Sequence, residues 1–188
     1  MPPSGPPPDP HHPDEATLAD LELLCRAPQH SALDPVYWRL ENKAIVEGVL
    51  QPIARPMAAA GVLGLARCAR RGVPFLLELL QQMTSADEAP LDPPAGYHAL
   101  VAAVEQEIVR GYPLYMSHLA GGDPTARLIS IDLLGLCGSL APELAERIRA
   151  ALREHVLARP GPEGREVAAF WIRELSNGQD GDDRWTSI

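Results

Sequence analysis

Apolar residues recur at helical spacing through most of this sequence, and glycine and proline separate the apolar segments. Residues three and four positions apart share one face of an α-helix, so each segment predicts an amphipathic helix. The two-residue alternation of a half-buried strand is missing, and β-branched residues are scattered. We therefore expect an all-α fold without strands. The predicted helices cover residues 14–25, 35–45, 57–71, 73–83, 97–109, 112–119, 125–140, 142–156 and 167–175.

Three pairs of residues are candidate helix starts. Asp34-Pro35 and Asp123-Pro124 each combine a side-chain acceptor at the N-cap with a proline whose missing N–H costs nothing at the first helical position. Thr17 and Asp20 have the spacing of a capping box. We expect Asp34, Asp123 and Thr17 to cap their helices.

A short motif repeats 39 residues apart, where Arg71-Gly72-Val73-Pro74 aligns with Arg110-Gly111-Tyr112-Pro113. This offset is near the period of HEAT and armadillo units. The motif predicts a helix that ends in arginine, a left-handed glycine cap and a second helix with proline in its first turn. The same residues also suit any helix–turn–helix connection, in which case a helical hairpin is still expected.

Several segments resemble bacterial HEAT-repeat proteins over about residues 35 to 140. The resemblance is carried by Tyr37-Trp38-Arg39-Leu40-Glu41-Asn42, Val46-Glu47-Gly48, residues 73–80 and Asp123-Pro124-Thr125-Ala126-Arg127. In that family an Asp-Pro-x-x-Arg element starts the first helix of a repeat, and Asp123, Pro124 and Arg127 match it. The resemblance implies antiparallel helix pairs stacked as a short HEAT-like α-solenoid, an architecture that commonly binds proteins.

The chain is expected to hold one helical domain between two irregular ends. Residues 1–13 are rich in proline and predict a disordered tail, residues 14–176 form a single HEAT-like domain, and residues 177–188 form a flexible acidic C-terminus. A long loop is expected at 84–96. Residues 1–13 do not resemble a secretory signal, and the apolar run Met57–Ala66 is too short to span a membrane, which favours a soluble, cytoplasmic protein.

Charge and cysteine content limit the classes of partner. The formal charge of −9 repels phosphate backbones, which disfavours nucleic acid and favours a basic protein partner. Cys25, Cys68 and Cys137 are odd in number, far apart in sequence and set among apolar neighbours. We expect them to be reduced thiols in the core.

Residue patterns typical of catalysis or metal binding were not found in the sequence. The six histidines include no pair at helical metal-site spacing, and no Cys-x-x-Cys, nucleophile elbow or phosphate-binding loop is present. Neighbouring carboxylates such as Glu105 and Glu107 do not share a helix face. We therefore expect no catalytic, cofactor or metal site and no enzymatic activity.

The candidate binding residues are aromatic and basic, because such side chains dominate protein interfaces. They also have a purely structural interpretation, as repeat core or as cations at a helix end. The candidates are Tyr37, Trp38, Arg67, Arg70, Arg71, Tyr112 and Tyr115.

The sequence favours a non-catalytic protein–protein interaction module that acts as a scaffold, an adaptor or an immunity-type inhibitor. The alternative is an enzyme similar to the helical-repeat DNA glycosylases, which would use a basic concave face lined by Trp38 and an aspartate.

Overall fold

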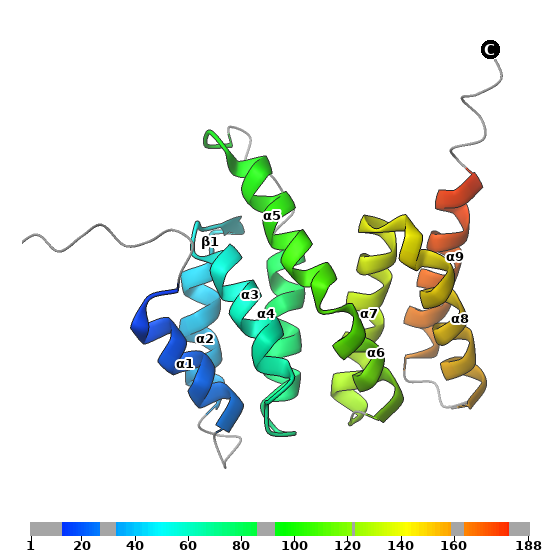
Figure 1. Cartoon of the computed structure of the whole chain (residues 1–188), viewed down its shortest axis with the longest axis horizontal. Helices are drawn as coiled ribbons and strands as arrows, with labels where there is room; N and C mark the ends of the chain where they lie inside the picture. Colours follow the sequence, from blue (N-terminus) through cyan, green and yellow to red (C-terminus); the bar gives the residue numbers. More distant parts are fainter. Residues whose placement is uncertain (1–12, 27–32, 86–92, 122, 159–163, 181–188) are drawn as a thin grey trace, which may run out of the picture. The chain divides into compact units, whose positions relative to one another are not determined.

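The computed structural model describes residues 13–26, 33–85, 93–121, 123–158 and 164–180, and these are mostly helical (Figure 1). The prediction of a helical fold is thus confirmed. Contacts divide the chain into two compact units, residues 1–107 and 108–188. The helices are α1 (Glu15–Arg26), α2 (Leu33–Ala44), α3 (Ala54–Leu65), α4 (Val73–Ser85), α5 (Tyr97–Arg110), α6 (Tyr112–Gly121), α7 (Pro124–Leu140), α8 (Pro142–Ala158) and α9 (Arg165–Asp180).

The first unit is assembled around α4. Helix α1 packs against α2 and α3, and α4 packs against both α2 and α3. Since α4 has neighbours on several sides, most of its side chains are buried, as its high apolar content requires. Its buried residues are Val73, Phe75, Leu76, Leu77, Leu79, Leu80 and Met83.

The second unit is assembled around α7, which contacts α6, α8 and α9. Two glycines of α7 let α9 approach closely. A Cβ at Gly135 would overlap the ring of Trp171, and one at Gly138 would crowd Leu175. The indole N–H of Trp171 donates a hydrogen bond of 2.9 Å to Oδ1 of Asp132, which gives this half-buried ring a polar partner.

A short β-hairpin follows α2, so the prediction of a fold without strands was wrong at this point. Strands β1 (Ile45–Val46) and β2 (Val49–Leu50) pair antiparallel. The two turn residues have positive φ, 52° at Glu47 and 79° at Gly48, as a tight type I′ connection requires. The Tyr97 hydroxyl lies 3.5 Å from the backbone nitrogen of Leu50. Two-residue strands are too short to produce a readable alternation.

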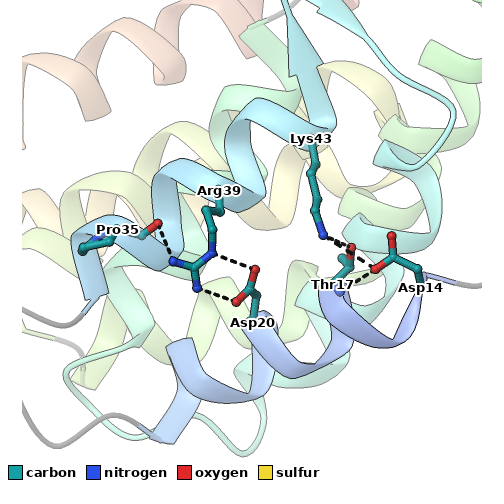
Figure 2. Close-up of polar contacts among 6 residues, drawn as sticks. All are labelled: Asp14, Thr17, Asp20, Pro35, Arg39 and Lys43. Atoms are coloured by element: carbon teal, nitrogen blue, oxygen red, sulfur yellow. Dashed lines mark hydrogen bonds and ion pairs between the residues drawn. The ribbon is translucent and has the colours of Figure 1, made fainter.

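Helix starts were predicted correctly at one of the three sites. Asp123 caps α7, since its carboxylate accepts from the backbone nitrogen of Ala126 at 3.0 Å, and Pro124 is the first helical residue. At α1 the cap is Asp14 instead of Thr17, because the Asp14 carboxylate accepts from the Thr17 backbone nitrogen at 2.6 Å (Figure 2). Asp34 lies inside the first turn of α2 instead of preceding it.

The Arg-Gly-x-Pro motif matches the prediction at its prolines and at Arg110, which ends α5, but not at its glycines. Pro74 and Pro113 are the second residues of α4 and α6, as expected. The glycines are not left-handed caps; a Cβ at Gly72 would overlap the Leu24 carbonyl, and one at Gly111 would overlap the Tyr115 side chain. Close approach therefore requires both glycines.

The α3 helix is shorter than predicted at its C-terminus. It ends at Leu65, so Arg67, Arg70 and Arg71 lie in the connection to α4 instead of in a last helical turn. The prediction that these arginines belong to the last turns of the helix is therefore wrong.

The predicted domain limits are only partly covered by the described residues. Residues 1–12 and 181–188 lie outside them, as does 86–92 within the predicted loop, while α9 continues to Asp180. A single domain over 14–176 stays a prediction. Among the described helices, none combines the length and the apolar character that a membrane span requires.

Candidate protein-binding groove

An apolar groove of about 580 Å³ lies along α1 and α3 in the first unit. Leu18 and Leu21 of α1 line one side, and Ala59, Ala60 and Leu63 of α3 line another. Its volume is within the range of ligand-binding clefts in proteins. A groove with this lining can bind apolar side chains from another molecule.

Small residues of α3 explain why the groove is not filled. Ala59 and Ala60 of α3 line the groove with short side chains, so among the described residues these two positions leave space beside α1. Leu63 is 67% exposed and Leu18 is 44% exposed, although both are leucines. Large exposed apolar side chains that share one concave surface indicate a binding site, whereas single exposed apolar side chains are common on any protein surface.

Positive charge dominates the charged part of the groove lining. Arg26 and Glu22 of α1 form an exposed ion pair with an N–O distance of 2.8 Å. Arg67 adds a further positive charge, and Arg70 and Arg71 are exposed on the same α3–α4 connection. A bound helix or peptide would thus meet apolar side chains in the groove and arginines at its edge.

Polar contacts fix α1 on α2 and so hold one wall of the groove (Figure 2). The guanidinium of Arg39 donates to both carboxylate oxygens of Asp20, at 2.6 Å and 3.2 Å. One turn further along α2, the Lys43 ammonium lies 3.0 Å from the Thr17 hydroxyl and 3.6 Å from the Asp14 carboxylate. A forked arginine–carboxylate pair has a defined geometry, so it restricts how α1 can rotate.

The cysteines do not share one environment. Cys137 is buried, as predicted, and burial raises its pKa to about 12. Cys25 and Cys68 are only half-buried, and Cys25 lines the groove. The prediction of core thiols was therefore wrong for these two. Although distant in sequence, they are brought together by the fold.

Two of the predicted binding residues belong to the core. Tyr37 is buried against Phe75, with ring centroids 6.1 Å apart, and burial raises its pKa. Tyr115 is fully buried, and its hydroxyl donates to the Ile108 carbonyl at 3.0 Å. These side chains offer almost no surface to a partner.

The other predicted binding residues are accessible to different degrees. Trp38 is 57% exposed on α2 but does not line the groove. Tyr112, in the second unit, is half-buried. Arg67 is the predicted residue that the structure brings to the groove, with Arg70 and Arg71 on the same connection.

The groove residues Leu18, Leu63 and Cys25 were not predicted as site residues. An almost entirely apolar helix such as α3 predicts burial on several sides, so the exposure of Leu63 is invisible in its pattern. The two adjacent alanines Ala59 and Ala60 are the signal that could have indicated an unfilled surface.

Comparison with family models, with curated proteins and with solved structures gave no match to this chain. Within the residues that the structure describes, no group of three or more His, Cys, Asp or Glu side chains could hold a metal ion. The resemblance to HEAT-repeat proteins stays a prediction.

Proposed function

We propose that this protein is a non-catalytic interaction module that binds an amphipathic helix of a partner protein in the groove between α1 and α3. The exposed Leu63 in an apolar groove is the observation that carries the proposal. Binding would remove this side chain and Leu18 from water, and burying a leucine contributes about 1.5–3 kcal/mol. A helix in a groove recognises its site through apolar residues spaced three and four apart.

The charges at the groove favour a partner helix with acidic residues beside its apolar face. The net charge of −9 predicts a basic partner, whereas in the groove lining the positive charges of Arg26 and Arg67 outnumber the negative charge of Glu22. At physiological salt, charges further than about 8 Å from a ligand are largely screened. The local arginines therefore outweigh distant carboxylates once the partner has docked.

We also propose that the helices of each unit form antiparallel pairs of the HEAT type. Sequence neighbours pack together in both units, α1 with α2 and α3 with α4, and α6 with α7 and α8 with α9. A scaffold, an adaptor and an immunity-type inhibitor would all use such a surface, and cytoplasmic location stays a prediction. The glycosylase alternative requires Trp38 in a basic face, and Trp38 does not line this groove.

Binding of a synthetic helix tests the proposal. The probe is a fluorescent amphipathic peptide with leucines on one face and glutamates beside them, titrated into the full chain and followed by anisotropy. The Leu63→Glu variant places a charge in the groove and should weaken binding at least about tenfold, because a carboxylate would have to be desolvated beside the peptide. Since Leu63 is exposed, this variant should keep its fold, as circular dichroism would verify.

The control variant is Leu157→Glu, which changes an 82% exposed leucine on α8 in the same way. It should bind the peptide like wild type. Equal binding by wild type and Leu63→Glu would contradict the proposed site. Tighter binding of a lysine-flanked peptide would contradict the acidic partner. Native-host lysate passed over all three proteins should then yield a partner that only Leu63→Glu fails to retain.

A further inference from the structure

We propose that Cys25 and Cys68 form a redox-sensitive thiol pair, in which a hydroperoxide oxidises Cys25 and Cys68 then closes a disulfide. This modification site goes beyond the binding function and does not depend on it. The pair would join the end of α1 to the connection between α3 and α4.

Backbone contacts hold the two cysteines next to each other. The amide nitrogen of Ala69 donates to the Cys25 carbonyl at 2.9 Å, and the Cys68 sulfur lies 3.9 Å from the same oxygen. The backbone at Gly72 is packed against the same region, since a Cβ there would overlap the Leu24 carbonyl and crowd the Cys68 sulfur. The α3–α4 connection therefore crosses the end of α1 in direct contact, which keeps both thiols in place.

Solvent access distinguishes Cys25 and Cys68 from the third cysteine. Cys25 and Cys68 are half-buried, and Cys25 lines the open groove, whereas Cys137 is fully buried in the second unit. A small oxidant can reach the Cys25 sulfur through the groove. Oxidation of thiols follows their exposure and their thiolate character, so Cys25 has the first of these two requirements.

The surroundings of Cys25 also favour its thiolate. A hydrogen bond from the Cys68 thiol lowers the pKa of Cys25, and the positive charges of Arg67 and Arg26 lower it further. Burial and the Glu22 carboxylate act in the opposite direction, but the pKa stays below its usual value. The hydrogen bond and burial raise the pKa of Cys68. The two thiols thus differ in role, with Cys25 as the nucleophile.

The reaction balances with one hydroperoxide and no other reactant. The Cys25 thiolate attacks the terminal peroxide oxygen, the O–O bond breaks, and the leaving alkoxide or hydroxide takes a proton to become an alcohol or water. The sulfur of the resulting sulfenic acid is attacked by Cys68, an S–S bond forms, and water leaves with the Cys68 proton. Two thiols are oxidised and one peroxide is reduced.

Hydrogen peroxide treatment of the reduced full chain tests the proposal. Wild type should lose two of its three free thiols and two hydrogen atoms in mass, and a peptide map should show Cys25 joined to Cys68. In the Cys68→Ser variant the reaction should stop at Cys25 sulfenic acid, which dimedone traps. In Cys25→Ser, oxidation of the remaining thiols should be slower by about tenfold or more.

Cys137→Ser is the matched control, and it should form the same disulfide as wild type at the same rate. Circular dichroism before oxidation verifies that each variant is folded. The proposal would be overturned if dimedone labelled Cys68 in Cys25→Ser as fast as Cys25 in Cys68→Ser. Disulfides only between molecules, or oxidation of Cys137 as fast as Cys25 in the folded protein, would overturn it as well.

Discussion

The two units use small helical residues with opposite results. In α7 of the second unit, Gly135 and Gly138 are covered by Trp171 and Leu175, and the helices close together. In α3 of the first unit, Ala59 and Ala60 lie along a groove that no side chain of the described residues fills. A small residue therefore gives close packing only where a neighbouring helix supplies a large side chain, and otherwise leaves a concave surface.

The covered glycines of the second unit contribute to stability, whereas the uncovered alanines of the first unit leave a surface for binding. Trp171 and Asp132 fix the packing of α9 on α7 through a hydrogen bond and a close ring contact. In the first unit, α4 forms the core and α1 is held at its polar edge by Arg39 and Lys43. This arrangement leaves the other side of α1 to line the groove. There Leu18 of α1 and Leu63 of α3 are exposed to solvent instead of being buried in the core.

The largest expected effect distinguishes a core leucine from a groove leucine. Leu133→Ala should lower the free energy of unfolding by about 2–5 kcal/mol, because this α7 side chain is buried and its loss leaves a cavity. Leu63→Ala should change it by no more than about 0.5 kcal/mol. Urea unfolding measures both. A large loss for Leu63→Ala would show that the groove wall is part of the core.

A second pair of variants tests the role of helical glycines. Gly135→Ala should cost about 1–3 kcal/mol, because the Trp171 ring occupies the position of the new methyl group. Gly61→Ala places its methyl group 3.5 Å from Leu80, an ordinary contact, and should stabilise by about 0.5–1 kcal/mol through helix propensity. Thermal melting compares the two. Equal changes in stability for the two variants would mean that contact with a neighbouring side chain does not decide whether a helical glycine can be replaced.

The smallest effect concerns the helix caps, one in each unit. Asp14→Ala and Asp123→Ala should each cost about 1 kcal/mol at neutral pH. Hydrogen bonds with Thr17 lower the pKa of Asp14 below 3.8, so its stabilisation is present above that value and is lost as the pH falls through the lower folded-state pKa.

The stabilities of wild type and Asp14→Ala, measured by urea unfolding across acidic pH, should therefore converge at the acid end. Lys43→Ala should reduce stability in wild type but have less effect beside Asp14→Ala, since the ammonium lies 3.6 Å from that carboxylate. Asp123→Ala is the control background, in which adding Lys43→Ala should lower stability as much as it does in wild type. If the unfolding free energies of wild type and Asp14→Ala ran parallel across the pH range, the Asp14 cap could not be the origin of the pH-dependent stability.

Helix positions were largely predictable because they depend on local pattern. Apolar spacing located every described helix, although α3 ends six residues earlier and α9 five residues later than predicted, and Asp123-Pro124 marked the start of α7. The errors lie where local signals compete. Asp14 caps α1 although Thr17 also has a suitable side chain, and the Glu47-Gly48 turn forms a hairpin too short to show a strand pattern.

The groove and the thiol pair could not be predicted, since both depend on which faces meet. The pattern of α3 indicates burial on several sides, and only its packing shows that Leu63 remains exposed. Cys25 and Cys68 are 43 residues apart, and the sequence does not reveal that the α3–α4 connection crosses the end of α1. Of the predicted site residues, Tyr37 and Tyr115 have the surface chemistry of interface residues but lie in the core.

The sequence by itself determined the helical class, the approximate helix limits and the negative charge, because these follow from local propensity and composition. The tertiary structure decided which small residues are covered, which leucines stay exposed and which cysteines meet. Those outcomes depend on contacts between residues distant in the chain, and the free energy of such contacts is set by side-chain shape at the point where two helices cross.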